Sequence, residues 1–469
     1  MKKTLISLSV ILVVAASCVG SKNPVLKIDG GKIQGILTET PDVYLFKGIP
    51  YAAPPVGDLR WKPPQPVVPW EGVKLADTYG PAAMQPPRQP GSFYYIEFYT
   101  DDAHQVSEDC LYLNISTPAP GKTDAGLPVA IYIHGGAYAS GYCYEKQFLG
   151  GEEWAKHGVI LVTINYRLNI FGYFSHPALS AESPNGVSGN YGLLDQIAAL
   201  KWVRNNIRQF GGDPDNITVF GQSAGAMSIQ SLITSDLSKD LMNKAIMESG
   251  GGVSERTMPG GGESPLEMAE QAGKDMMDFG GYNTLEAMRA VPAADLLTLM
   301  NNYRKENRRG MMGPVVDGYV LTKNFSEAAL KGEISDIPYI IGFNKDDIGM
   351  LKEGYGLFCR LREASGKKTY AYEFMRELPG DSAGAFHSAE LWYVFNTLSN
   401  SWRPFTDGDY TLSEYMVDAW TNFAKYGNPN GKEKEIWSPY TKENQQFMIL
   451  TLDSSGKAEH TMGLPSNSQ

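Results

Sequence analysis

Short apolar runs rich in β-branched residues recur along the chain and alternate with longer amphipathic segments. Five such runs occupy residues 129–133, 159–164, 217–220, 245–247 and 339–343. Continuous apolar runs of this length, separated by helical patterns, are typical of parallel strands that are buried on both faces.

The clearest helical pattern lies between the second and third of these runs. Its apolar residues recur at spacings of 4, 3, 3 and 4, and they are Leu193, Ile197, Leu200, Val203 and Ile207. This spacing places all five on one helix face, and Gly211-Gly212 predicts where the helix ends. Residues 266–305 also have a helical composition, and we expect them to cover an edge of the sheet. The alternation predicts an α/β fold with helices on both faces of a mostly parallel sheet.

Composition and charge narrow the class of protein. Apolar residues make up 42% and charged residues 20% of the 469 residues, which is the balance of a globular protein. With a net charge of −11, the chain lacks the excess of basic residues that is typical of nucleic-acid-binding proteins, so we expect no nucleic-acid partner. No repeat or linker divides the chain after its N-terminal segment, and we expect residues 18–469 to form a single domain.

The N-terminus has the pattern of an export signal. Lys2 and Lys3 precede a mostly apolar run over residues 5–16, and small residues lead to Cys18. The run is too short to span a bilayer, which takes roughly 20 residues. We therefore predict a signal peptide over residues 1–17 and a protein that is periplasmic, secreted or held at the cell envelope. Two alternatives stay open: ordinary cleavage, or a lipid anchor on Cys18 that would be the only contact with a membrane.

A candidate nucleophile follows the third apolar run directly. Residues 217–220 lead into Gly221-Gln222-Ser223-Ala224-Gly225, and a helix-compatible stretch comes next. A Gly-x-Ser-x-Gly sequence between a strand and a helix is the nucleophile elbow of α/β-hydrolases, in which the serine occupies a strained turn above the sheet. This context favours a catalytic Ser223 over a serine in an ordinary loop.

A second glycine-rich turn follows the first apolar run. Residues 129–133 end in His134-Gly135-Gly136-Ala137. Glycines after a strand allow backbone N–H groups to point into a site, and acyl transfer needs such donors where the oxyanion forms. The alternative is a plain tight turn.

These motifs, with several others in order along the chain, resemble the type-B carboxylesterase family, the cholinesterase-like branch of the α/β-hydrolases. The matching segments are FKGIPYA (46–52), EDCLYLN (108–114), NYR (165–167), GNYG (189–192), FGQSAGA (220–226) and PVVDG (314–318). The resemblance covers nearly all of the chain after the signal segment. It implies an α/β-hydrolase fold and a serine ester hydrolase that needs no metal and no organic cofactor.

The order serine, acid, histidine in α/β-hydrolases narrows the remaining catalytic residues. Only His387 and His460 follow Ser223, and His460 lies beyond a polar segment that suggests exposure to solvent. His387 lies in GAFHSAE (384–390), which resembles the family's histidine motif, so we predict that His387 is the base. The family match places the acid on Asp347, where Glu is usual, and Asp346 is the competing candidate.

The resemblance also implies supporting residues. The backbone N–H groups of Gly136, Ala137 and Ala224 would form the oxyanion hole. Ser249 and Glu390 match residues that support the histidine from behind, although ordinary hydrogen bonding in the core would explain both equally well.

The chain departs from the family pattern in two places. The segment 80–85 has no cysteine where the family has a partner for Cys110, so we expect Cys110 to lack its disulfide and the aromatic loop at 93–99 to be more mobile. Asp347 and His387 are only 40 residues apart in number, which implies a reduced helical cap and a more open site. The rings of the aromatic loop could line that site or pack among themselves.

Three functions are compatible with the sequence. The first is a carboxylic ester hydrolase that acts through an acyl-enzyme on small-molecule or polymer-linked esters. The second is an esterase that removes acetyl or aromatic acyl groups from polysaccharides. The third is a non-catalytic, cholinesterase-like binding protein, which the presence of Ser, Asp and His in the expected order disfavours.

Overall fold

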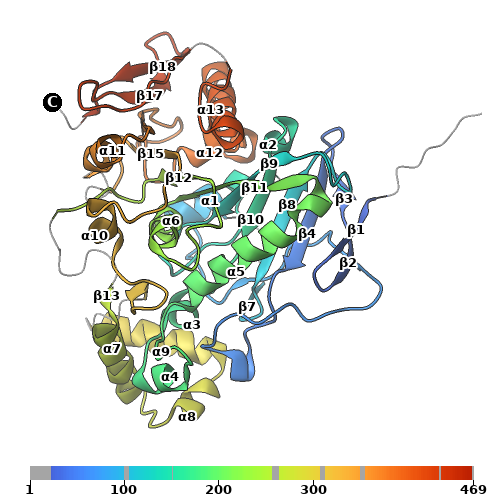
Figure 1. Cartoon of the computed structure of the whole chain (residues 1–469), viewed down its shortest axis with the longest axis vertical. Helices are drawn as coiled ribbons and strands as arrows, with labels where there is room; N and C mark the ends of the chain where they lie inside the picture. Colours follow the sequence, from blue (N-terminus) through green and yellow to red (C-terminus); the bar gives the residue numbers. More distant parts are fainter. Residues whose placement is uncertain are drawn as a thin grey trace, which may run out of the picture.

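One central sheet organises the molecule (Figure 1). The protein is described by a computed structural model that covers residues 23–99, 105–149, 151–255, 264–306, 312–348, 354–432 and 435–466. Eleven strands of the described chain form the sheet, in the spatial order β18 (Ala458–Gly463), β17 (Phe447–Leu452), β16 (Thr369–Phe374), β15 (Tyr339–Asn344), β12 (Lys244–Glu248), β11 (Gly212–Gln222), β9 (Leu127–Ile133), β10 (Ile160–Ile164), β8 (Tyr112–Thr117), β4 (Tyr44–Pro50) and β3 (Ile36–Leu37).

The centre of the sheet is parallel, as the apolar runs predict. The strands from β10 through β9, β11, β12, β15 and β16 to β17 pair in parallel, while β8, β4 and β3 at one edge and β18 at the other pair antiparallel. All five predicted strands are present and lie among the parallel ones. The sequence prediction missed the parallel strands β16 and β17 and the antiparallel strands at the two edges.

Helices cover both faces of the sheet, as predicted. One face packs against α5 (Tyr191–Asn206), α6 (Ala224–Thr234), α10 (Phe325–Leu330) and α11 (Tyr355–Ala364). The other face packs against α2 (Glu152–Lys156), α12 (Leu391–Val394) and α13 (Asp407–Tyr426). Neighbouring strand residues alternate between the two cores: Val219 faces the α5 and α6 side, and Phe220 faces the α13 side. This alternation follows from the two-residue period of a strand.

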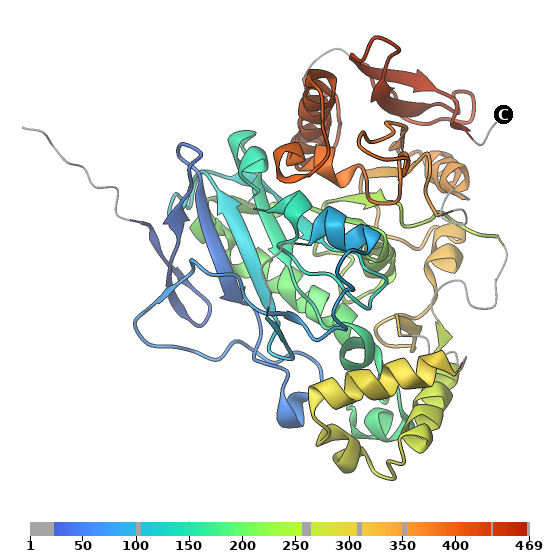
Figure 2. The same cartoon turned by 180° about the vertical axis from the view of Figure 1, so that it is seen from behind.

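The predicted helical segment at 266–305 forms a small cluster of its own (Figures 1 and 2). It contains α7 (Leu266–Phe279), α8 (Leu285–Arg289) and α9 (Ala293–Lys305), which share a core with α3 (Asn169–Tyr173) and α4 (Pro177–Glu182). The expectation that this segment covers an edge of the sheet is therefore wrong, because its apolar side packs against α3 and α4.

The remaining elements that the structure describes are short. They are β1 (Val25–Ile28), β2 (Gly31–Gln34), β5 (Val73–Leu75), β6 (Ala82–Ala83), β7 (Val106–Ser107), β13 (Ser264–Pro265), β14 (Val315–Val316), α1 (Phe93–Phe98) and four 3₁₀ turns at Gly57–Leu59, Lys146–Phe148, Ile207–Phe210 and Leu398–Asn400. Within the described residues, no helix combines the length and the apolar character that crossing a membrane requires. The predicted signal segment and Cys18 lie outside the described residues.

Candidate active site

The carboxyl ends of the parallel strands carry the predicted site residues. Ser223 follows β11, Gly136 follows β9, and Asp347 follows β15. Because these strands are parallel neighbours, their carboxyl ends meet at one edge of the sheet, where open α/β sheets bind their ligands.

Ser223 occupies the sharp turn that the motif predicts. It lies between the last residue of β11 and the first residue of α6, with φ of 58° and ψ of −126°. Its backbone N–H donates to the carbonyl oxygen of Glu248 at 2.8 Å, which ties the turn to the end of β12. A non-glycine residue with this backbone conformation is strained by about 1–3 kcal/mol, a feature that concentrates at functional sites.

The glycines of the motif are required by the close approach of β9. A Cβ atom on Gly225 would lie 2.0 Å from the carbonyl oxygen of Ile133, and one on Gly221 would lie 2.6 Å from the same oxygen. Both distances are far inside van der Waals contact. The helix α6 can therefore follow the strand this closely only with glycine on both sides of the turn.

The turn after β9 lies directly against the nucleophile. A Cβ on Gly135 would lie 3.0 Å from the Cβ of Ser223, and one on Gly136, at φ of 102°, would lie 2.0 Å from the carbonyl oxygen of Ser140. Ala137 continues the turn with φ of 56°. Ala224 is the first residue of α6, a position whose backbone N–H has no partner within its own helix. The turn that carries Gly136 and Ala137 thus lies against the elbow, and Ala224 directly follows Ser223.

Asp347 and His387 form a direct acid–base pair. Asp347 Oδ1 lies 2.5 Å from His387 Nδ1, and both residues are buried. Burial raises the pKa of the Asp347 carboxyl, but hydrogen bonds from His387 and from the backbone N–H of Asn344 help to outweigh burial and leave that pKa below its usual value. An ionised Asp347 accepts the hydrogen bond of His387 Nδ1, so Nε2 is the ring nitrogen that can take up a proton.

Gln222 places the imidazole beside the nucleophile. Its Nε2 lies 3.3 Å from His387 Nε2 and 3.4 Å from His387 Nδ1, and Gln222 directly precedes Ser223. No hydrogen bond joins Ser223 Oγ to His387 in the described structure. Catalytic hydrogen bonds are often long or poorly aligned until substrate binds. Sequence reasoning assigned Gln222 no role, although it lies inside the motif.

Asp346 has a different role from Asp347. It is exposed, and its Oδ2 accepts a hydrogen bond of 2.8 Å from the backbone N–H of Ala385, while its own N–H donates to the Ala385 carbonyl. Asp346 therefore fixes the loop that carries His387 but does not contact the imidazole. Of the two candidates, the structure pairs Asp347 with the histidine.

Ser249 and Glu390 lie behind this pair, at the positions that the resemblance implies. Ser249 is fully buried, follows β12 and interacts with Asp347. Glu390 is also fully buried and accepts a hydrogen bond from Asn344 Nδ2. Burial raises the pKa of Glu390 to about 7, and the charge of Asp347 adds to that effect.

His460 lies apart from these residues. It is on the edge strand β18, where its ring stacks on Tyr415 of α13 with centroids 3.8 Å apart. The expectation that polar neighbours leave this histidine in solvent is wrong, because Tyr415 covers it and it is only partly exposed.

The aromatic loop packs over the segment that carries His387 (Figure 2). It forms the helix α1, whose Tyr94 hydroxyl donates to the His387 carbonyl oxygen at 3.3 Å. Phe93 packs edge-on against Phe386 with ring centroids 4.8 Å apart. A buried ion pair between Glu97 and Arg403, 2.7 Å apart, holds the other end of the helix. The rings therefore do more than pack among themselves, as they also cover the catalytic loop.

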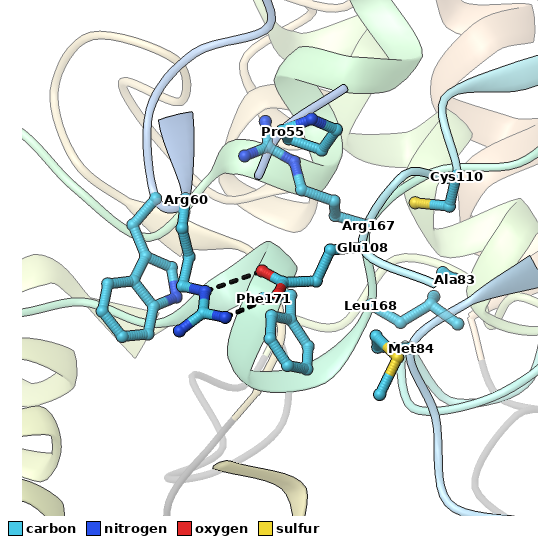
Figure 3. Close-up of a pocket in the computed structure, with 10 residues that line it drawn as sticks. Pro55, Arg60, Ala83, Met84, Glu108, Cys110, Arg167, Leu168 and Phe171 are labelled. Atoms are coloured by element: carbon cyan, nitrogen blue, oxygen red, sulfur yellow. Dashed lines mark hydrogen bonds and ion pairs between the residues drawn. The ribbon is translucent and has the colours of Figure 1, made fainter. Parts of the chain in front are cut away.

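Cys110 has no disulfide, as the sequence predicts. Cys110, Cys143 and Cys359 are all free and buried. The segment that lacks the partner cysteine contributes Ala83 and Met84 to a small pocket beside Cys110, where Arg60 and Glu108 form a two-pronged ion pair (Figure 3). Further along this segment, the side chain of Gln85 exchanges two hydrogen bonds with the backbone of Gly141. Polar contacts thus hold the segment where the family pattern has a disulfide.

Known proteins resemble this chain over most of its length. The model of the Carboxylesterase family matches residues 22–356 and 350–463. A fumonisin B1 esterase from Sphingopyxis macrogoltabida is 42% identical over 362 residues, a match that covers 76% of this chain but only 61% of that relative. A para-nitrobenzyl esterase from Bacillus subtilis is 34% identical over 494 residues, with 92% of this chain and 96% of the relative covered.

Solved structures give the same result for the fold. A thermophilic PNB esterase superposes with a TM-score of 0.82 at 31% identity, covering 95% of this chain and 99% of that one. A carboxylesterase from Geobacillus stearothermophilus superposes with a TM-score of 0.77 at 31% identity, covering 93% and 97%. These likenesses confirm the predicted α/β-hydrolase fold.

Proposed function

The chain belongs to the carboxylesterase family, and we propose that it hydrolyses carboxylic esters with Ser223 as nucleophile, His387 as base and Asp347 as the acid that orients the base. The observation that carries this assignment is the 2.5 Å contact between Asp347 and His387 beside the strained turn of Ser223. A merely structural histidine would not need a buried carboxylate on Nδ1 next to a nucleophile elbow.

The geometry supports a two-step reaction. His387 Nε2 removes the hydroxyl proton as Ser223 Oγ attacks the ester carbonyl carbon, and the oxyanion accepts hydrogen bonds from the N–H groups of Gly136, Ala137 and Ala224. The imidazolium then gives its proton to the departing alcohol, which leaves an acyl group on Ser223. Water attacks this acyl-enzyme by the same route in reverse, and the carboxylic acid is released.

A burst experiment tests this function directly. Mixing the enzyme with p-nitrophenyl acetate is expected to release about one equivalent of p-nitrophenol per enzyme in a fast phase, before slower steady turnover. Mass spectrometry of the quenched mixture should find one acetyl group on the peptide that contains Ser223. A protein that binds the ester without a burst and without an acylated peptide would be the non-catalytic binding protein of the third alternative.

We also propose that α1 encloses the acyl chain of the substrate. The segment between Asp347 and His387 is short, and its described part contains only α11, β16 and the loop to the histidine. An open site would follow from this shortness alone. The Tyr94 hydroxyl donates to the carbonyl oxygen of His387, however, and this contact supports the proposal that α1 closes part of the site. The polysaccharide alternative needs an open cleft, which this arrangement does not favour.

Acyl-chain selectivity measures this enclosure. Each methylene that a wall encloses contributes about 0.8 kcal/mol, or roughly fourfold in kcat/KM. We expect a steep dependence of kcat/KM on chain length from acetyl to octanoyl esters, and a much flatter one after Tyr94 and Tyr95 are both replaced by alanine. Tyr94→Phe is the matched control, since it loses the hydrogen bond to His387 but keeps the ring. A steep preference that survives the double replacement would assign the wall to another element.

We infer export from the N-terminal segment alone. Its two lysines, apolar run and small residues before Cys18 support a cleaved signal, with or without a lipid on that cysteine. Mass spectrometry of the protein isolated from its native cells distinguishes the cases. An intact N-terminus beginning near Met1 would contradict export, and an added lipid mass on Cys18 would identify the anchored form.

A further inference from the structure

One arginine near the active site lacks the carboxylate partner that comparable arginines have. Every other arginine of the described chain that is not exposed forms an ion pair, with N–O distances of 2.5–3.1 Å. Arg88 is only partly exposed, yet no carboxylate oxygen that the structure describes lies within ion-pair distance of its guanidinium. A partly desolvated charge without a counter-charge costs free energy, so a ligand that supplies the counter-charge gains by binding there.

On one side, Arg88 contacts the turn that follows β9. Its Nη2 donates to Ser140 Oγ at 3.3 Å, and the backbone N–H of Ser140 donates to the carbonyl oxygen of Gly136 at 3.0 Å. The same segment of the chain is fixed to this turn a second time, through the two hydrogen bonds between Gln85 and the backbone of Gly141. Arg88 is therefore held one residue contact away from the turn that lies against the nucleophile.

On the other side, Arg88 contacts the aromatic rings of α1 and of the residue that follows this helix. Its guanidinium carbon lies 4.2 Å from the ring centroid of Tyr99 and 5.9 Å from that of Tyr94. The Tyr94 hydroxyl in turn donates to the carbonyl oxygen of His387. The positive charge thus lies between the turn that would bind the oxyanion and the helix that packs on the histidine loop.

The contacts of Arg88 leave its charge available to a ligand. Aromatic rings stabilise a guanidinium but do not neutralise it, and Ser140 accepts from one of its five N–H donors. Glu145 is a buried carboxyl whose charge acts on Arg88 from beyond ion-pair distance, but burial raises the pKa of Glu145, and its Oε2 already accepts from Gln147. A carboxylate would fit the planar fork of the guanidinium and supply the missing negative charge.

We propose that Arg88 is a specificity-determining residue that binds a carboxylate on the acyl part of the substrate. The enzyme then prefers half-esters of dicarboxylic acids to neutral esters of the same shape. This inference deepens the proposed ester hydrolysis and rests on it. The acyl part is favoured over the alcohol because the rings that contact Arg88 belong to the segment that we propose encloses the acyl chain.

Matched pairs of ethyl esters measure this preference. Monoethyl succinate, glutarate and adipate, which are ionised at about pH 7.5, are each compared with the neutral ester in which an isopropyl group replaces the carboxylate. A charge-assisted hydrogen bond discriminates by roughly 10- to 100-fold, so at least one half-ester should exceed its neutral partner in kcat/KM by that factor. Ratios near one for all three pairs would overturn the proposal, and turnover of the neutral esters would leave the proposed hydrolysis standing.

Substitutions of Arg88 show where the preference comes from. Arg88→Gln should bring the ratio within each pair close to one, and Arg88→Lys should restore part of it, since lysine keeps the charge but not the fork. The ratio does not depend on how much of a variant is folded. An Arg88→Gln enzyme with the ratio of the wild type would overturn the proposal.

Arg360→Gln is the matched control for the loss of one positive charge. Arg360 is exposed and donates to the hydroxyl of Tyr440, whose backbone N–H donates to the carbonyl oxygen of Thr369. Thr369 begins β16, so this arginine lies near the amino ends of the parallel strands, opposite the site. Its replacement should leave the ratio at the wild-type value, and an equal fall in both variants would show that only the net charge matters and would overturn the role of Arg88.

A further pair of esters places the charge on the alcohol instead. 4-Acetoxybutyrate is compared with 4-methylpentyl acetate, in which an isopropyl group again replaces the carboxylate. The ratio of kcat/KM within this pair is expected to lie near one. A preference for 4-acetoxybutyrate that Arg88→Gln removes, without any preference for the half-esters, would overturn the assignment to the acyl part.

Calorimetry with adipate separates this inference from ester hydrolysis itself. Adipate has no ester bond, and it is expected to bind the wild type at least about 10-fold more tightly than it binds Arg88→Gln. Adipate that does not bind the wild type, or that binds Arg88→Gln equally well, would overturn the proposal. Since the measurement needs no turnover, a protein that binds adipate through Arg88 but hydrolyses no ester would contradict the proposed function and leave the carboxylate site standing.

Discussion

Ser223→Ala is expected to lower kcat/KM for p-nitrophenyl acetate by on the order of 10⁵-fold and to remove the burst of p-nitrophenol, because no other group at the elbow can form the acyl-enzyme. Alanine keeps the Cβ atom, so it fits the same turn at φ of 58° with no new strain. The fold and the melting temperature should therefore change little, and the loss of activity will come from the missing hydroxyl nucleophile rather than from unfolding.

Ser228→Ala is the matched control for this experiment. Ser228 is a buried serine on the same helix, α6, and its hydroxyl accepts a hydrogen bond of 3.0 Å from Gln196. Its replacement should cost some stability but leave the stoichiometry of the burst near one. If Ser223→Ala retained turnover close to that of the wild type, the nucleophile would have to be another residue.

Asp347→Asn is expected to lower kcat by about 10³-fold or more while the fold stays intact. The amide can still lie beside His387 Nδ1, 2.5 Å away in the wild type, but it neither selects the tautomer with a free Nε2 nor stabilises the imidazolium that forms during attack. The low pKa of Asp347 also means that the wild-type enzyme loses this charge only under strongly acidic conditions.

The neighbouring residue provides a sharp comparison. Asp346→Asn should change kcat by only a few fold, because an amide oxygen can still accept the hydrogen bond from the backbone N–H of Ala385. The two variants differ by one position in a single loop and remove the same charge. Equal losses, or a larger loss from Asp346→Asn, would show that the acid has been assigned to the wrong residue.

The parallel sheet and the nucleophile could be predicted because both depend on local patterns. Apolar runs such as 339–343 have to be buried on both faces, and Gly-x-Ser-x-Gly after a strand has one well-defined geometry. The edge strands were missed because β18, with its partly exposed residues, has no apolar run to reveal it. The packing of α7 and α9 was misjudged because an amphipathic helix shows that it is covered but not which surface covers it.

The amino-acid sequence by itself determined the family, the order of serine, acid and histidine, and the glycines that let β9 and α6 approach the elbow. Only the tertiary structure decided between Asp346 and Asp347. The two residues are adjacent in the chain, but the side chain of Asp347 contacts His387 and that of Asp346 contacts the backbone of Ala385. It also brought Tyr94 of α1 into hydrogen-bond contact with the carbonyl oxygen of His387, although the two residues are far apart in the chain. A contact between such distant residues depends on how strands and helices pack, and no local pattern encodes it.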